Sequence, residues 1–294
     1  MGVRHHMDLD YVKNLCFEPS DQTYVSRDSI LYALSLGMGS DPLNEDELPY
    51  VYEGRGLKIV PSQCVTLGWQ PMWHRDPRAG IDWVSIVHGE LAFTLHRPLT
   101  IQGKVRTFHD LKSIEDKGPG RGALLHFEHL VTDKEFDTPL ATIRSVQFLR
   151  GDGGCGNWGI PVLGSSPLEI NVHPSWQIDY STSPQGALMY RQASHDLMPI
   201  HADPDVARMA GFDRPISHGL HTMGLACRAI LKRYAPSQPE RLLEMSVRFV
   251  RPAFPGETVR IELFEYGDLV RFRARSVERD LLLLDRGSAL LKAI

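Results

Sequence analysis

The first half of the chain contains one helical segment followed by a series of strand-like segments. Between Asp28 and Leu36 apolar residues recur at helical spacing, with Ser26 or Asp28 as a candidate N-cap and Gly37 as a stop signal, so we expect an amphipathic helix. From about residue 58 to 149 the apolar runs become short or alternating, and glycine-rich or charged turns separate them. This pattern is typical of antiparallel strands.

The same mixture of elements returns after a stretch rich in glycine, proline and serine. This stretch contains too many turn formers for a core element, so we interpret residues 151–187 as a linker. Beyond it the pattern predicts a strand at 187–194, helices at about 204–210 and 219–234, and four further strands. Apolar residues surround most of the second helix, which is typical of a helix buried on all sides.

Both halves therefore indicate a strand-rich sheet packed on at most one long helix, an α+β architecture. A His-Gly pair occurs in each half, at His88-Gly89 and at His218-Gly219, and we interpret the two pairs as a sign of internal duplication. The predicted units cover residues 1–150 and 188–294, sizes that are ordinary for a domain.

The charge balance argues against one class of partner. The 294 residues include 32 Lys+Arg against 36 Asp+Glu, which gives a formal net charge of −4. Because there is no basic excess to attract a phosphodiester backbone, nucleic acid is not an expected partner. A local basic cluster must hold any anionic ligand.

The four cysteines lie far apart, and no CxxC pair or Cys/His group has the spacing of zinc ligands. We therefore expect neither disulfides nor a metal site. The N-terminus lacks the apolar stretch of a signal peptide, and no run approaches the roughly 18 to 20 apolar residues that span a bilayer. The C-terminal LLKAI is not an SKL-type address. The sequence predicts a cytoplasmic protein without membrane contact.

Candidate chemistry is concentrated in residues 190–228, a segment dense in polar, glycine and proline residues. The pair Asp203-Pro204 predicts a helix start, which places His201 on a loop five residues after Asp196. A carboxylate and an imidazole on one loop can converge on a single water, as general acid–base catalysis requires. A second interpretation stays open, in which Asp196 caps a turn and His201 is a partly buried loop histidine.

Gly219 begins the long predicted helix. Its backbone N–H would lie at the positive end of that helix, with no side chain to keep a ligand oxygen away. Such a donor can stabilise an oxyanion. The alternative is that glycine at this position only allows close packing of the helix on the sheet.

Residues 190–224 resemble the signature of the type 2, R-specific enoyl-CoA hydratases and the wider MaoC-like dehydratases. The matching runs are YRQASHD and PIHADPDVARMAGFDRPISHGLHTMG. Further matches follow the same order along the chain, namely YVYEGRGLKIVPS, IVHGELAFTLHRPL, DKGPGRG and RFVRPAFPGETV, so the resemblance covers about residues 10 to 290. It implies a tandem, or double, hotdog fold with two antiparallel sheets, each wrapping a helix, and a degenerate N-terminal helix.

The resemblance implies reversible hydration of a trans-2-enoyl-CoA to a (3R)-3-hydroxyacyl-CoA, without a metal or a redox cofactor. By position in the signature, Asp196 and His201 would hold and deprotonate the water and return a proton to C2. The N–H of Gly219 would bind the thioester oxygen. The N-terminal unit has no Asp-x4-His and would be non-catalytic, widening the acyl tunnel, and the family also implies a homodimer.

The sequence departs from the family signature at two positions. His195 stands where the family has a glycine, and we expect it to face solvent. Met198 stands where the family has an asparagine that orients the water or the catalytic pair. Its thioether offers no useful hydrogen bond, so it either fills a pocket for a different acyl group or weakens hydration.

The phosphates of CoA need local cations in a net-acidic protein. Arg248 and Arg251 lie where the family places basic residues near the nucleotide, and Arg191 beside the site is a third candidate; a solvated strand face is the alternative. Two other functions stay open. One is a hotdog acyl-CoA thioesterase, in which water attacks the thioester carbonyl, and the other is an acyl-CoA-binding subunit with weakened catalysis.

Overall fold

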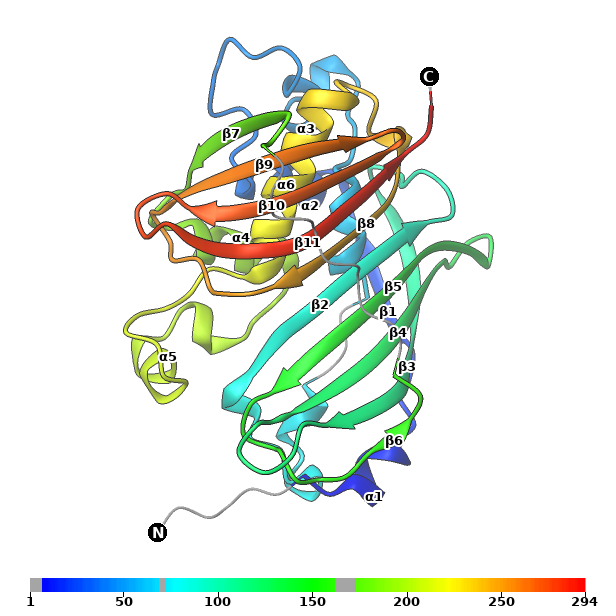
Figure 1. Ribbon diagram of the computed structural model, residues 1–294. Helices are drawn as coiled ribbons and strands as arrows, with labels where there is room; N and C mark the ends of the chain where they lie inside the picture. Colours follow the sequence, from blue (N-terminus) through cyan, green and yellow to red (C-terminus); the bar gives the residue numbers. More distant parts are fainter. Residues whose placement is uncertain (1–6, 69–71, 162–172, 294) are drawn as a thin grey trace.

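The computed structural model describes residues 7–68, 72–161 and 173–293. Within these ranges eleven strands form one antiparallel sheet in the order β1-β3-β4-β5-β2-β8-β11-β10-β9-β7, with β6 attached to β3 (Figure 1). The strands are β1 Ser20–Tyr24, β2 Ile86–Leu95, β3 Gly103–Asp116, β4 Ala123–Asp133, β5 Thr138–Leu149, β6 Trp158–Gly159, β7 Trp176–Ser181, β8 Leu242–Phe249, β9 Thr258–Tyr266, β10 Leu269–Ser276 and β11 Leu281–Leu291.

One long helix lies against the C-terminal strands. Every residue of this helix, α6, from Leu220 to Leu231 is buried, which confirms the prediction of a helix enclosed on all sides. The other α-helices are α1 Leu9–Lys13, α2 Ser26–Ser35, α3 Leu48–Val51, α4 Gly186–Ser194 and α5 Pro204–Met209, and α6 itself is Gly219–Tyr234. The 3₁₀-helices are η1 Glu53–Arg55, η2 Pro61–Thr66, η3 Trp73–Arg75, η4 Pro77–Ala79, η5 Trp83–Ser85, η6 Pro199–His201 and η7 Pro239–Arg241.

The two halves repeat one topology. The N-terminal strands follow the order β1-β3-β4-β5-β2, and the C-terminal strands follow the matching order β7-β9-β10-β11-β8. Helix α2 follows β1 as α4 follows β7, and the two helices pack together. Before β2 the six buried residues of η2 stand where the 16-residue α6 stands before β8. The predicted double hotdog with a degenerate N-terminal helix is confirmed.

Strands β2 and β8 join the two sheets into one. They pair antiparallel from Glu90 opposite Arg248 to Thr94 opposite Glu244. Each of these strands follows the central helical element of its own half. Because β2 and β8 pair, the sheet face that packs on η2 and the sheet face that packs on α6 enclose one common interior.

Two sequence predictions need correction. The strand predicted at 187–194 is helix α4, because its alanine, leucine, methionine and glutamine residues favour a helix and its buried positions, such as Ala187, Tyr190 and Ser194, recur at helical spacing. The predicted linker at 151–187 contains β6, which pairs with β3, and β7, which is an edge strand of the C-terminal sheet. Residues 162–172 of that segment lie outside the described residues.

The two His-Gly pairs are not repeats of each other. His88-Gly89 lies within β2, whereas His218-Gly219 lies at the start of α6. Since β2 corresponds to β8, the two pairs occupy different positions in the repeated topology. The duplication is present, but the pairs that suggested it were the wrong signal.

No helix in the described part of the chain is long and apolar enough to cross a membrane.

A buried ion pair ties α6 to the N-terminal half. Arg228 on α6 donates from Nε to Glu47 Oε1 at 2.6 Å and from Nη2 to Glu47 Oε2 at 2.9 Å. A third donation, from Nη1, reaches the main-chain oxygen of Leu36 at 3.0 Å. Both charged side chains are nearly inaccessible to solvent, so each depends on the other.

We expect Glu47→Ala to lower the free energy of unfolding by about 3–5 kcal/mol, because it leaves the Arg228 charge buried and unpaired. Urea denaturation monitored by tryptophan fluorescence measures the change. Arg144→Ala, which removes the partner of Glu128 in an exposed pair, is the control and should have only a small effect. A loss for Glu47→Ala no larger than that of the control would contradict the importance of the buried pair.

Candidate active site

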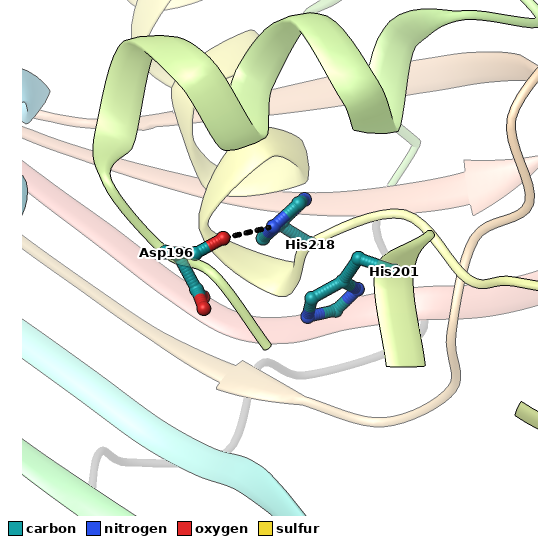
Figure 2. A group of neighbouring side chains, drawn as sticks. All are labelled: Asp196, His201 and His218. Atoms are coloured by element: carbon teal, nitrogen blue, oxygen red, sulfur yellow. Dashed lines mark hydrogen bonds between the residues drawn. The ribbon is translucent and has the colours of Figure 1, made fainter. Parts of the chain in front are cut away.

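Three side chains from separate elements meet at the N-terminus of α6. Asp196 follows helix α4, His201 ends the 3₁₀-helix η6, and His218 is the N-cap residue of α6 (Figure 2). The chain turns sharply between the first two elements because His195 adopts a left-handed conformation with φ of 59°. One ligand atom from each of the three side chains lies within 4.8 Å of the others.

His201 is held as a neutral imidazole with one defined tautomer. Its Nδ1 lies 2.9 Å from the main-chain oxygen of Ile216. A carbonyl oxygen can only accept, so Nδ1 carries the proton and Nε2 keeps its lone pair. Burial lowers the pKa of His201 below its ordinary value, and the nearby Asp196 carboxylate opposes that shift. The ring is therefore available as a base at neutral pH.

His218 contacts both Asp196 and His201 and helps to hold them in place. Its Nε2 donates to the main-chain oxygen of Asp196 at 3.3 Å, the dashed line in Figure 2. Its ring stacks on that of His201, with centroids 3.6 Å apart and planes 25° apart. Burial lowers the pKa of His218 well below its ordinary value, so the two stacked rings carry no mutual charge repulsion.

The Asp196 carboxylate is buried, with 3% of the residue exposed. Its Oδ1 accepts from the main-chain N–H of Met198 at 3.2 Å. The main-chain N–H of Asp196 donates to the Ser194 hydroxyl at 3.2 Å, which holds the loop at its start. Oδ2 has no hydrogen-bond partner among the described residues, so it is available to a ligand.

Gly219 is the first residue of α6, and its N–H finds no acceptor in the part of the chain that the structure describes. A Cβ at this position would lie 2.9 Å from Cδ1 of Phe249, closer than side chains pack. Glycine is therefore required by packing, as one of the two sequence interpretations held. The same packing leaves a free donor at the positive end of the helix.

All of these groups except His218 line one cavity of about 930 Å³. Strands β2 to β5 also line it, together with residues of β8 and β11, so both halves of the chain contribute to it. His88 on β2 is a lining residue that the sequence analysis did not assign to the site. Its Nδ1 is buried without a partner among the described residues, and burial lowers the pKa of its ring while the nearby Asp196 carboxylate opposes that shift.

Comparison with known proteins matches both halves of the chain. A model of the MaoC like domain matches residues 167–285, and a model of the MFE-2 hydratase 2 N-terminal domain matches residues 22–151. The chain is 32% identical to the peroxisomal enoyl-CoA hydratase 2 of Arabidopsis thaliana over 278 residues, which cover 88% of this chain and 87% of that protein. This chain belongs to the MaoC-like hydratase 2 family.

Solved structures agree with this family assignment. The crystal structure of a MaoC-like dehydratase from Phytophthora capsici superposes with a TM-score of 0.82 at 28% identity, covering 97% of this chain and 99% of that one. A Mycobacterium tuberculosis protein described as having a double hotdog fold superposes with a TM-score of 0.59 at 14% identity, covering 99% of each chain. The second likeness concerns the fold alone.

The two positions that depart from the family signature differ in their surroundings. His195 is exposed, as expected, and takes a left-handed conformation that a glycine adopts without steric cost. Met198 lines the cavity and packs against a small apolar cluster that includes Ile200 and Ile216. Met198 is therefore a packing residue of the cavity wall.

The three candidate arginines do not lie together. Arg248 and Arg251 are exposed lining residues of the cavity, and neither forms an ion pair within the described ranges. Arg191, on α4, does not line the cavity, but its charge acts on His201 and lowers the pKa of that residue, so it lies beside the site. Its role in binding CoA stays a prediction.

The group of Asp196, His201 and His218 also offers three potential metal ligands. A zinc ion needs nitrogen lone pairs that converge on one point about 2.0–2.1 Å away. The lone pairs of His201 and His218 lie in ring planes that are stacked 3.6 Å apart and inclined by only 25°, and Nε2 of His218 already donates to a carbonyl. The arrangement favours acid–base chemistry over metal binding.

We expect Gly219→Ala to destabilise the fold by about 1–3 kcal/mol, because the new methyl group must displace Phe249. Gly186→Ala is the matched control, since Gly186 also begins a helix and a Cβ there would meet nothing within 4 Å. Urea denaturation of both variants measures the difference. Equal stability of the two variants would show that α6 and β8 are not closely packed at Gly219.

Proposed function

We propose that this chain catalyses the reversible addition of water to a trans-2-enoyl-CoA, giving a (3R)-3-hydroxyacyl-CoA. The observation that carries the proposal is the meeting of a buried carboxylate, a neutral imidazole and an unpaired helix N–H on one cavity. Relatives named as enoyl-CoA hydratases support it, including the Arabidopsis thaliana protein and an enoyl-CoA hydratase of Mycobacterium tuberculosis.

Asp196 and His201 act on the water. The free Oδ2 of Asp196 and the lone pair on Nε2 of His201 hold one water molecule between them and remove its proton. The resulting hydroxide oxygen forms a bond to C3. The proton then passes from the acid–base pair to C2 on the same face, so that one water adds in full and no net proton is gained or lost.

Gly219 makes C3 electrophilic. The electron pair of the C2–C3 double bond moves toward the thioester oxygen as the new C3–O bond forms, and this oxygen gains enolate charge. The N–H of Gly219, at the positive end of α6, donates to that oxygen. When C2 takes its proton, the carbonyl is restored. The acid–base pair and the donor must therefore act in the same step.

Arg248 and Arg251 are the cations that we assign to the CoA phosphates, because both are exposed on the lining and free of acidic partners in the described part. The N-terminal half supplies a wall of the acyl site. We include no metal or redox cofactor in the reaction. The cytoplasmic location and the homodimer stay predictions from the sequence.

We expect Asp196→Asn and His201→Ala each to lower kcat for hydration of the best enoyl-CoA by about 10²- to 10⁴-fold, the scale for loss of a positioned acid–base group. Loss of enoyl thioester absorbance measures the rate. Asp205→Asn and His96→Ala, at positions outside the cavity lining, are the controls. Activity of either site variant within threefold of wild type would show that the roles are wrongly assigned.

The same assay separates the other functions. Release of free thiol in place of hydration would identify a thioesterase, and tight acyl-CoA binding without turnover would identify a binding subunit. Hydration that persists in a chelator would agree with the metal-free scheme.

We expect the acid limb of the kcat/KM profile to have its midpoint below pH 6.5. His201 is a base only while neutral, and burial lowers its pKa, so the active form persists as the pH falls until that lowered pKa is reached. In Asp196→Asn the acid limb of the residual activity should have its midpoint at a still lower pH than in the wild type, because the Asp196 carboxylate raises the pKa of His201. A midpoint above 6.5 in the wild type would contradict this environment for His201.

A further inference from the structure

The cavity wall supplied by the N-terminal half is largely apolar, but it contains polar side chains that a plain acyl chain of methylene groups would leave without partners. Among the lining residues on this side that carry hydrogen-bonding side chains are His74, Thr107, His109, His129, Ser145 and Gln147. His109 and Ser145 are buried, with 8% and 6% exposed. Polar groups buried beside a ligand site need partners in the complex.

Strand register places most of these groups on one face of the sheet. On β5 the alternate residues Ser145 and Gln147 share a face, and Gln147 lies directly opposite His88 on β2. His129 on β4 lies opposite both Ile143 on β5 and His109 on β3. The polar groups therefore form a continuous strip that begins beside the catalytic groups and extends across three strands.

Four of the side chains in and beside this strip form a hydrogen-bonded chain. Ser20 contacts His109 Nε2 at 2.8 Å, the Nδ1 atoms of His109 and His129 lie 2.9 Å apart, and His129 Nε2 lies 3.2 Å from the Ser145 hydroxyl. Only one proton fits between the facing Nδ1 atoms of the two rings. All the hydrogen bonds in this series therefore donate in the same direction, either toward Ser145 or toward Ser20.

Ser145 is the last residue of this hydrogen-bonded series, and its hydroxyl can form a further hydrogen bond. If His129 donates to Ser145, the hydroxyl proton remains to be donated into the cavity. If Ser145 donates to His129, its lone pairs face the cavity. Gln147 adds to this capacity, because its Oε1 pairs with His74 Nε2 at 2.7 Å and its amide hydrogens have no partner among the described residues.

The side chains of this polar strip carry no charge. Burial lowers the pKa of His129 to about 3 and that of His74 to about 4, and it lowers the pKa of His109 as well. The three rings are therefore neutral at physiological pH. Neutral donors and acceptors match a neutral oxygen function better than they match a carboxylate.

We propose that the acyl chain of the substrate carries a hydroxyl or ketone oxygen that hydrogen-bonds to Ser145 and Gln147 on this polar strip. The inference rests on the proposed hydration reaction and specifies its substrate class. A plain alkyl chain would remove water from these polar groups and give them no partner in return. An oxygenated chain supplies the partner.

The position of the oxygen follows from the strand. Gln147 is level with His88 beside the catalytic pair, and Ser145 lies two residues, or roughly 7 Å, further along β5. A carbon chain covers that distance in roughly five or six bonds. With C3 at the catalytic pair, the oxygen belongs at about C8 or C9.

The test compares trans-2-decenoyl-CoA with its 6-, 7-, 8- and 9-hydroxy derivatives and with the 8-oxo derivative. We expect kcat/KM of the wild type to be at least tenfold higher for the 8- or 9-hydroxy substrate than for the plain one. Ser145→Ala should reduce this ratio below threefold, because it removes the partner of the oxygen and so lowers kcat/KM more for the oxygenated substrate than for the plain one.

Ser113→Ala is the matched control, since Ser113 is a buried serine on β3 that does not line the cavity. It should keep the wild-type ratio. A wild-type ratio below twofold at every position, or an equal loss on both substrates in Ser145→Ala, would overturn the inference and leave the proposed hydratase function intact. Failure of the wild type to hydrate any of these thioesters would instead contradict the proposed function.

Discussion

The enclosure of α6 by the sheet is the constraint on which both fold and site depend. A helix buried on every side can expose only its ends, and the N-terminal end opens on the cavity. Its free N–H and positive dipole end thus face the cavity beside buried side chains, where a hydrogen bond to developing charge is stronger than in water. The Arg228–Glu47 pair fixes the same helix against the N-terminal half, so helix position and cavity shape are set together.

The catalytic pair depends on main-chain hydrogen bonds more than on other side chains. The carbonyl of Ile216 selects the tautomer of His201. The carbonyl of Asp196 accepts a hydrogen bond from His218, whose ring stacks on that of His201. Because both acceptors are backbone atoms, the positions of these rings do not depend on the side chain at residue 198. Met198 can therefore stand in place of a hydrogen-bonding residue of the signature while the geometry of Asp196 and His201 is kept.

The N-terminal half, in which the central helix is degenerate, supplies part of the volume of the cavity. In the C-terminal half a 16-residue helix fills the curve of the sheet, whereas six residues of η2 occupy the equivalent place in the N-terminal half. A sheet that wraps a shorter element leaves volume unfilled, and this volume is part of the cavity. Loss of a helix on one side thus gives room for an acyl chain, and the polar strip on β3 to β5 then determines which chain is bound.

Local spacing along the sequence was sufficient to predict the central strands of both halves, though not β6 or β7, together with the buried helix at 219–234 and the segment that carries Asp196, His201 and Gly219. These features depend on hydrophobic period, capping residues and a contiguous signature, all of which neighbouring residues encode. Only the tertiary structure placed His88 beside the catalytic pair, excluded Arg191 from the cavity and aligned His109, His129 and Ser145 on one face. Those placements follow from the pairing of β2 with β8 and from strand register across residues distant in sequence, and no local pattern specifies either.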